Sequence, residues 1–209
     1  DCLLSRGLGD VYKRQSQLMP ELPEVETTKN AILPFKGKTL KRIIVNNPSL
    51  RWPIDEKAIN KIKERRILSI TRRAKYIFLN LGEITIIIHL GMTGTFRIQK
   101  LGSNETRKHD HVIFEFSKEI LIFNDPRRFG SLHVSKDLQN HFLIKNLGPE
   151  PLEDDFNSEY LCKKIKKAGV STKSFLMNQK NVVGIGNIYA CEILSVSYTH
   201  LRAHETRGN

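Results

Sequence analysis

The sequence is poor in cysteine, and this scarcity excludes two kinds of architecture. Its 209 residues contain three cysteines, Cys2, Cys162 and Cys191, which lie far apart and form no Cys-x-x-Cys pair. Neither a disulfide framework nor a thiolate zinc site can be built from such a set. We therefore predict no metal site in this chain, and a reducing compartment is the simplest setting for it.

Long hydrophobic runs are also missing. The most apolar stretch, residues 84–90, is too short to span a bilayer, which takes about 20 residues. The N-terminal segment lacks the apolar core and the small-residue cleavage site of a signal peptide. These absences lead us to expect a soluble, cytoplasmic protein with no membrane partner.

Acidic residues are outnumbered by basic ones. Lys and Arg total 34 against 22 Asp and Glu, which gives a net charge of +12 and a pI near 9.7. A chain of this charge attracts polyanions, and nucleic acid comes first among them. Charge alone does not identify a ligand, so a generic RNA-associated or ribosome-associated basic protein is an alternative, although the sequence contains no recognisable RNA-binding motif.

Both ends of the chain lack the amphipathic period that would tie them to a core. We interpret residues 1–18 and 196–209 as non-native extensions that resemble translated adapter sequence, and we exclude them from the fold prediction. His200 and His204 are spaced like metal ligands on a helix, but no third ligand accompanies them.

The middle of the chain predicts an α+β fold with two domains. Prolines at the start, an apolar face and Pro34 at the end predict a helix within residues 20–34. Further on, Pro149 and Pro151 interrupt regular structure. We expect a β-sandwich domain with a leading helix at residues 19–150 and a partial helical domain at 151–195. The expected strands are residues 40–45, 67–71, 76–79, 84–90, 95–98, 112–116, 120–123 and 131–134, and the expected helices of the second domain are near residues 159–167, 173–178 and 187–194.

The residues from Met19, MPELPEVE, resemble the N-terminus of formamidopyrimidine-DNA glycosylases, also called Fpg or MutM. In that family the initiator methionine is removed and the exposed proline is the nucleophile, a role that the resemblance assigns to Pro20. A terminal amine titrates near pH 8 and a lysine near about 10.4, so the terminal amine offers roughly a hundredfold more free base at neutral pH. Inside a chain the proline nitrogen is an amide. We therefore expect the chain as written to be a catalytically inactive DNA-binding fragment, and an ordinary helix-start proline is the plain alternative for Pro20.

Two carboxylates follow this proline. Glu21 and Glu24 lie near the predicted helix N-terminus, where the amides and the helix dipole stabilise negative charge. The resemblance implies that Glu21 protonates the opening sugar. Helix capping is the alternative role, and it is the one we expect for Glu24.

Three later motifs resemble motifs of the family. Arg72-Arg73-Ala74-Lys75-Tyr76 joins two predicted strands, and its three cations could reach a phosphate or the lesion. An exposed basic turn is the alternative. The resemblance makes Lys75 the residue that assists proton transfer during elimination. An enzyme that acts on a base inside a duplex must extrude it at a cost of a few kcal/mol and fill the gap. The loops HLGMTG and DPRRFG resemble the family loops that do so. The resemblance assigns the gap to Met92, Arg127 and Phe129, with Arg127 also reading the orphaned cytosine.

Two further DNA contacts are implied by the resemblance. His109 and His111 alternate on a predicted strand, which is weak evidence for a metal site, and the family pattern assigns His109 to phosphate binding. LMNQKNVVGIGNIYACE resembles the family's helix-two-turn-helix element, in which Asn187 contacts the DNA backbone. Its glycines precede a helix and predict backbone amides open to a phosphate. Lys167 is the one residue carried over from the cluster of lysines at 163, 164, 166 and 167.

The resemblance covers residues 19 to about 194 and predicts a function. It implies a monomeric bacterial DNA glycosylase and AP lyase of base excision repair, which removes 8-oxoguanine and formamidopyrimidines from double-stranded DNA by β,δ-elimination in the cytoplasm, at the nucleoid. Family members continue to a four-cysteine zinc finger. We therefore expect an intact gene product to bind structural zinc, and we expect this chain to bind no cofactor. The alternative is an endonuclease VIII-like glycosylase for oxidised pyrimidines, but MPELPE in place of MPEGPE, together with DPRRFG, favours purines.

Overall fold

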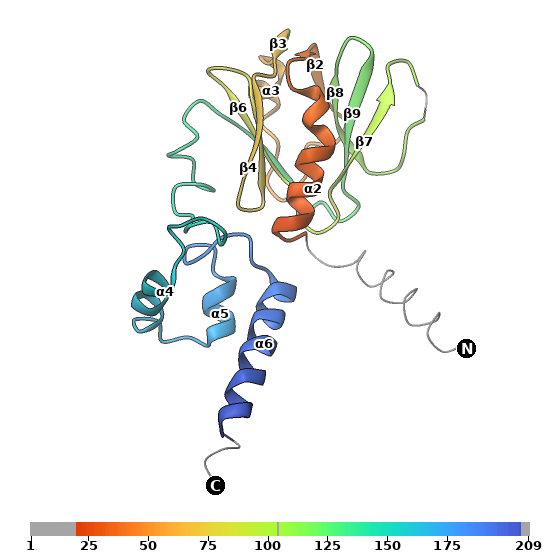
Figure 1. The fold of residues 1–209 in the computed structure, drawn as a ribbon. Helices are drawn as coiled ribbons and strands as arrows, with labels where there is room; N and C mark the ends of the chain where they lie inside the picture. Colours follow the sequence, from red (N-terminus) through yellow and green to blue (C-terminus); the bar gives the residue numbers. More distant parts are fainter. Residues whose placement is uncertain (1–19, 104, 206–209) are drawn as a thin grey trace, which may run out of the picture. The chain divides into compact units, whose positions relative to one another are not determined.

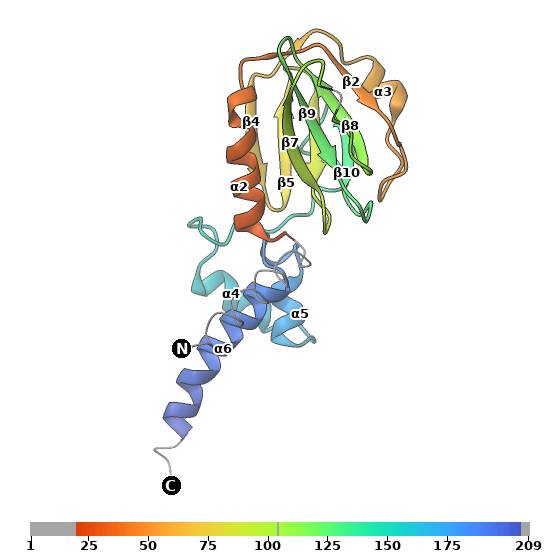
Figure 2. The same ribbon diagram turned by 90° about the vertical axis from the view of Figure 1, so that its right-hand side faces the viewer.

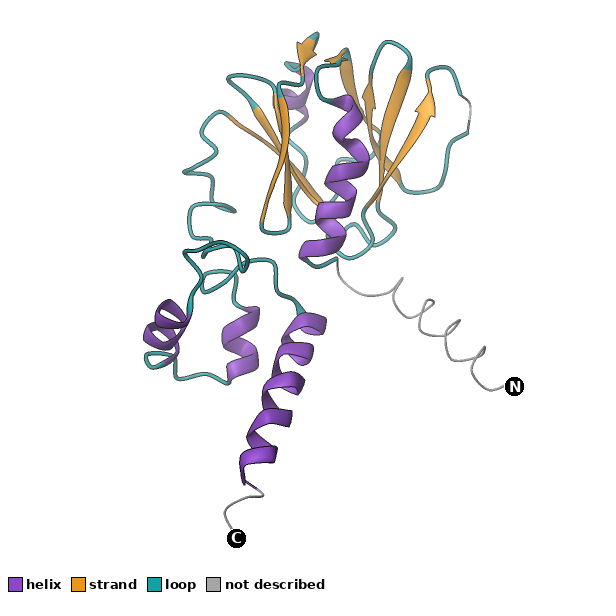
Figure 3. Ribbon diagram, in the orientation of Figure 1, coloured by secondary structure: helices purple, strands orange, loops and turns teal. Residues whose placement is uncertain are grey.

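The computed structural model describes residues 20–103 and 105–205, with side chains to residue 197. It divides into two compact units, one ending at Leu138 and the other beginning at Gln139 (Figure 1). The proposed extension at residues 1–18 lies outside the described residues. The first unit contains the sheets and the second contains helices and loops (Figure 3), so the α+β fold class is confirmed.

Residues 139–150 group with the helical unit, whereas the sequence suggests a boundary near Pro151. The reason lies in the backbone. The amide of Gly148 donates to the carbonyl of Gln179 at 2.8 Å, and the amide of Val183 donates to the carbonyl of Pro149 at 3.0 Å. These bonds join the segment to the helical residues, although Pro149 itself cannot continue a regular element.

The first unit begins with helix α2, Leu22–Ile32. A capping box at Glu21 and Glu24 starts the helix, and Pro23 occupies a first-turn position that tolerates proline. Its buried residues Val25 and Ile32 face the core. The chain then passes through the short 3-10 helix η1, Leu33–Phe35, so the predicted helix and its end at the Pro34 region are confirmed.

Two four-stranded antiparallel sheets form the sandwich (Figure 2). One has the order β10-β6-β5-β4 and the other β2-β8-β9-β7. Helix α2 contacts β4 and β5 of one sheet and β7 of the other, so it closes the side of the sandwich between edge strands β4 and β7 (Figure 1). The strands are β2 Arg42–Val45, β4 Ser69–Arg73, β5 Tyr76–Asn80, β6 Thr85–His89, β7 Thr95–Lys100, β8 Asp110–Glu115, β9 Glu119–Asn124 and β10 Ser131–Ser135.

Three short elements were not predicted. The strand expected at residues 40–45 is broken, because β1, Thr39–Leu40, pairs with β3, Arg65–Arg66, while β2 joins a different sheet. Helix α3, Glu56–Asn60, begins where the Asp55 side chain accepts the amide of Ala58 at 3.0 Å. Strands of two residues and a helix of five are too short to show the hydrophobic period of their type.

The core of the first unit lies between the sheets. Fully buried aliphatic side chains from β5, β6 and β10 pack with aromatic and aliphatic side chains from β8 and β9 in one cluster. Burying a side chain of this kind stabilises the fold by about 1.5–3 kcal/mol. The members that anchor it include Ile77, Leu79, Ile86, Ile88, Leu132, Val112, Phe114, Leu121 and Phe123.

The second unit contains helices α4, Ser158–Ile165, α5, Thr172–Met177, and α6, Asn187–Glu205. Asn157 and Ser171 cap the first two through their side-chain oxygens. A small cluster of Phe175, Leu176, Val182, Ile185 and Ala190 forms its core. Helix α6 continues beyond residue 194 into the segment proposed as a non-native tail, and residues 206–209 lie outside the described part. Among the described helices, none is long and apolar enough to cross a membrane.

Candidate active site and nucleic-acid interface

Strand register brings most of the predicted site residues of the first unit to one end of the sandwich. Tyr76, the first residue of β5, pairs with His89, the last residue of β6, and His89 pairs with Ser131 at the start of β10. In the other sheet, Asn124 at the end of β9 pairs with Thr95 and with Asp110. The turns at residues 74–75, 90–94 and 125–130 and the approach to β8 at residue 109 therefore share this end.

The start of helix α2 contributes Pro20 and Glu21. Pro20 is half-buried, and the Glu21 side chain is 2% exposed. The Glu21 carboxylate accepts the backbone amide of Glu24, while the Glu24 carboxylate accepts the amide of Glu21 at 3.0 Å. Glu24 caps the helix as predicted, and Glu21 takes part in the same capping box, so the helix start fixes the carboxylate that follows the proline.

Lys75 lies in the two-residue turn between β4 and β5. Its side chain is buried at 7% exposure, so the turn is no solvated basic loop. Burial lowers the pKa of the Lys75 ammonium, and the charges of Glu21 and Glu24 oppose that shift. The lysine and the two carboxylates therefore lie close enough for their charges to interact.

Arg72 fixes this turn to helix α2. Its guanidinium donates to the Glu26 carboxylate at 2.8 Å and to the carbonyl of Ala74 at 2.9 Å. Ala74 has a φ of 54°, a left-handed conformation that a residue with a Cβ adopts at some cost. Sequence reasoning placed Arg72 among cations that could reach a phosphate, but the structure gives it a positioning contact within the protein.

A pocket of about 530 Å³ opens at the same end of the sandwich. Met92 and Phe129, both predicted to fill a gap in a duplex, line it, and Phe129 is 44% exposed. Arg127 is exposed, and its guanidinium lies over the Phe129 ring with 5.0 Å between the guanidinium carbon and the ring centroid. The remaining lining residues are Leu50, Arg51, His89, Gly91 and Arg128.

His89 and Arg51 are pocket residues that sequence reasoning missed. Burial of the imidazole, reinforced by the charges of Arg51 and Lys75, lowers the pKa of His89 to about 4. Its Nδ1 accepts the amide of Gly91 at 3.0 Å, so the neutral ring has its proton on Nε2 and can act as a hydrogen-bond donor. The sequence signal that could have predicted His89 as a pocket residue is its position directly before the loop that contains Met92.

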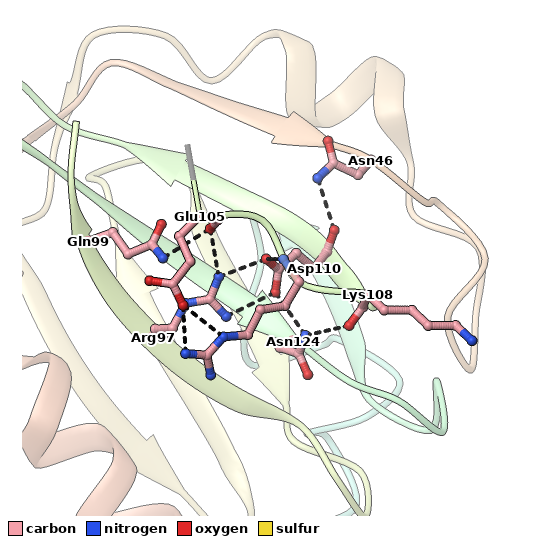
Figure 4. A network of polar contacts seen from close by, with 8 residues as sticks. Asn46, Arg97, Gln99, Glu105, Lys108, Asp110 and Asn124 are labelled. Atoms are coloured by element: carbon pink, nitrogen blue, oxygen red, sulfur yellow. Dashed lines mark hydrogen bonds and ion pairs between the residues drawn. The ribbon is translucent and has the colours of Figure 1, made fainter. Parts of the chain in front are cut away.

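His109 lies just before β8, with a φ of 78°. The next residue, Asp110, is the centre of a polar network (Figure 4). Its carboxylate accepts hydrogen bonds from the Arg97 guanidinium at 2.8 Å, the Arg107 amide at 2.9 Å and the Asn124 side chain at 2.8 Å. Burial acts to raise the pKa of Asp110, but these donors outweigh it and lower the pKa. An ionised Asp110 thus fixes the backbone on which His109 is placed.

Of the two alternating histidines, His111 lies in β8 and makes a contact within the fold. His111 is 3% exposed, and its Nε2 lies 2.8 Å from the backbone carbonyl oxygen of Asp125. In the part of the chain that the structure describes, no group of three or more His, Cys, Asp or Glu side chains could hold a metal ion.

The helical unit has its own candidate residues. Asn187 is exposed at the first position of α6, and Lys167 is exposed beyond the end of α4. The expectation of open glycine amides is wrong at Gly184, because this amide donates to the Gln179 side-chain oxygen at 2.8 Å. Gln179 also donates to the carbonyl of Ile185 at 2.9 Å, so it stabilises the turn before α6.

These features define a class. The chain is a basic α+β protein with a β-sandwich followed by a helical unit. At one end of the sandwich lie a buried lysine, a glutamate that caps a helix, and an exposed arginine and phenylalanine. Such a combination suits acid-base chemistry on a polyanion.

Comparison with known proteins identifies the family. The model of the formamidopyrimidine-DNA glycosylase N-terminal domain matches residues 19–132, and that of the formamidopyrimidine-DNA glycosylase H2TH domain matches residues 147–203. The chain belongs to the formamidopyrimidine-DNA glycosylase family. It is 47% identical over 186 residues to the formamidopyrimidine-DNA glycosylase of Hydrogenovibrio crunogenus, a match that covers 87% of this chain and 66% of the relative.

Two solved structures of the Lactococcus lactis enzyme are similar to this chain. One is bound non-covalently to DNA containing an AP site, with a TM-score of 0.77, 32% identity, and coverage of 83% of this chain and 68% of that chain. The other is bound to DNA containing an oxidised pyrimidine, with a TM-score of 0.77, 33% identity, and coverage of 84% and 67%. The present chain thus spans about two thirds of the length of the relatives it matches.

Proposed function

We propose that this chain is the catalytic sandwich and helical part of a bacterial DNA glycosylase and AP lyase that removes oxidised purines from duplex DNA. The observation that supports it most directly is the grouping of Pro20 and Glu21 at the start of α2 with the buried Lys75. Family membership and the relatives' DNA-bound structures supply the substrate class.

The chemistry follows from the residues at the helix start. When Pro20 is the N-terminal residue, its nitrogen lone pair attacks C1′ of the damaged nucleotide and the bond to the base breaks. Glu21 supplies the proton that opens the sugar. The secondary amine then forms an iminium, which accepts electron density from the adjacent carbon when a proton is removed there, and the phosphates leave by β- and δ-elimination.

Lys75 suits proton transfer in these steps. Burial lowers its pKa and so raises the fraction of free amine above that of an exposed lysine at the same pH. The neighbouring charges of Glu21 and Glu24 act in the opposite direction and favour the protonated form. A lysine balanced in this way can both donate and accept a proton.

The contact with DNA would involve both units. In the first unit, Met92, Arg127 and Phe129 would enter the gap that an extruded nucleotide leaves, and His109 would bind phosphate. In the second unit, Asn187 and Lys167 would contact the backbone. A DNA substrate would place a monomeric protein in the bacterial cytoplasm, at the nucleoid. A zinc site in a longer form of the protein stays a prediction.

Borohydride trapping tests the proposal. A form that starts at Met19 and loses this methionine should become covalently attached to duplex DNA containing 8-oxoguanine opposite cytosine. The 209-residue chain is the matched control, because its Pro20 nitrogen is acylated and should give no adduct. Absence of an adduct from the Pro20-start form, extended to the length of its relatives, would refute the proposal.

An oxidised pyrimidine is the second candidate substrate, because one relative has been solved on DNA with such a lesion. A duplex containing 5-hydroxycytosine, trapped in parallel, compares the two classes. Faster trapping on the pyrimidine lesion would favour it. Retardation of either duplex in a gel without any adduct would instead support a DNA-binding fragment without catalytic activity.

A further inference from the structure

One buried carboxylate joins the two loops that line the pocket. We name residues 90–94 the Met92 loop and residues 125–130 the Arg127 loop. Asp125 is 0% exposed. One of its carboxylate oxygens accepts the Thr93 hydroxyl at 2.5 Å, and the other accepts the Gly130 amide at 2.7 Å. The bond from Thr93 joins the two loops, whereas the bond from Gly130 closes the Arg127 loop on itself. Both have a buried carboxylate as acceptor, and such charge-assisted bonds are about twice as strong as neutral ones.

Thr93 is also a hydrogen-bond acceptor for the Arg127 loop. Its hydroxyl oxygen accepts the backbone amide of Arg127 at 3.1 Å. The hydroxyl therefore donates to the first residue of the Arg127 loop and accepts from the third. A side chain of the same shape without the hydroxyl would lose both bonds and leave a buried carboxylate oxygen without this donor.

The backbone of Asp125 extends the connection to the segment of His109. Its amide donates to the carbonyl of His109 at 3.1 Å, and its carbonyl oxygen lies 2.8 Å from Nε2 of His111. Asp125 therefore contacts each of the three segments that contain the predicted DNA-contacting residues of the first unit.

The side chains at the tips have few restraints of their own. Arg127 is exposed and Phe129 is 44% exposed. The Arg127 guanidinium lies over the Phe129 ring, with 5.0 Å between the guanidinium carbon and the ring centroid. The backbone that places both side chains is held by the bonds of Asp125 to Thr93 and Gly130 and by the bond of the Arg127 amide to Thr93. Side chains that are oriented before binding lose less conformational entropy when they enter a partner.

We propose that Asp125, acting through Thr93, is a positioning residue that holds the Met92 loop and the Arg127 loop as one unit, so that Met92, Arg127 and Phe129 enter a gap in duplex DNA together. This proposal rests on the proposed function for its substrate. It assigns no chemical step to Asp125 or Thr93, since both act through the loops they join.

Thr93→Val is the test variant, and Thr93→Ser is its matched control. Valine retains the shape of threonine and removes the hydroxyl, whereas serine retains the hydroxyl and removes a methyl group. Amide hydrogen exchange in the free 209-residue chain gives the first readout. The Arg127 amide should exchange about tenfold faster in Thr93→Val and at the unsubstituted rate in Thr93→Ser. Unchanged exchange in Thr93→Val would overturn the proposal.

DNA binding gives the second readout. The probes are two duplexes of one sequence, one intact and one with a tetrahydrofuran abasic analogue opposite cytosine. Thr93→Val should lose about tenfold of the preference for the abasic duplex, which is about 1.4 kcal/mol, with unchanged affinity for the intact duplex, and Thr93→Ser should retain the preference.

The outcomes separate the two proposals. If Thr93→Val keeps the preference of the unsubstituted chain, the positioning role is overturned. If both affinities fall together, or Thr93→Ser fails to restore the preference, the residue serves the fold alone and the proposal is likewise overturned. If the unsubstituted chain shows no preference for the abasic duplex, the DNA contacts that the proposed function assigns to this chain fail, and the exchange rates still decide whether Thr93 joins the loops.

Discussion

Replacing Gly91 by alanine should destabilise the first unit through two effects that the chain allows to be separated. Gly91 has a φ of 67°, and an added Cβ would lie 2.3 Å from the Gly130 nitrogen and 2.3 Å from the Phe129 carbonyl carbon. A left-handed residue with a Cβ costs about 1–2 kcal/mol, and forcing two packed segments apart costs about 1–3 kcal/mol. The variant should therefore lose about 2–5 kcal/mol of unfolding free energy.

Thermal unfolding measures this loss, and two other glycines supply controls. A chain of this size loses about 2–4 °C of melting temperature per kcal/mol, so the transition should fall by about 4–20 °C. Gly102 has a φ of 86° but no atom within 4 Å of an added Cβ, so Gly102→Ala measures the backbone cost alone. Gly169→Ala meets nothing within 4 Å and should have little effect. Equal melting temperatures for Gly91→Ala and Gly102→Ala would refute the steric argument.

Three further predictions concern titration and positioning. Because burial lowers the Lys75 pKa below 10.5, the charged form is penalised in the folded state. Lys75→Met should therefore be more stable than the unsubstituted chain at pH 7, and urea titrations should show this advantage shrinking as the pH rises toward 10.5; a constant difference would contradict the shift. The His89 pKa is about 4 and its ordinary value is 6.5, so the folded state resists protonation of this ring. The unfolding free energy should therefore fall by up to about 3 kcal/mol as the pH falls from 6.5 to about 4, and that of His89→Gln should fall by less over the same range. In a double-mutant cycle, Arg72→Met and Glu26→Gln should show a coupling of about 0.5–1 kcal/mol in unfolding free energy. A coupling of zero would contradict the positioning role of this ion pair.

Much of the fold could be predicted because its elements signal themselves locally. The strands of the sandwich are runs of β-branched and aromatic residues long enough to show their type, and helix α2 has prolines and carboxylates at its start. Strands β1 and β3 could not be predicted in this way, since two residues contain no period. Helix α3 has only Asp55 as a local signal.

The site was only partly predictable, because its geometry depends on residues far apart in the chain. Thr93 and Asp125 are separated by 32 positions, and Glu26 and Arg72 by 46. No local pattern shows that Arg72 binds a carboxylate within the protein and is not available to a phosphate. His89 was missed for the same reason, since its surroundings of Arg51 and Lys75 arise only when the strands pair. The roles of Pro20 and of the DNA contacts stay predictions.

The arrangement of the turns has a practical consequence for labelling. The β5–β6 connection at residues 81–84 and the β8–β9 connection at residues 116–118 come at the other ends of the strands from the Met92 loop. Gly82 and Glu83 are exposed there, and exposed loop tips accept foreign sequence more readily than other positions. A fluorophore or an affinity peptide placed at Glu83 would report on the sandwich while the pocket, its rim and the helix start remain chemically untouched.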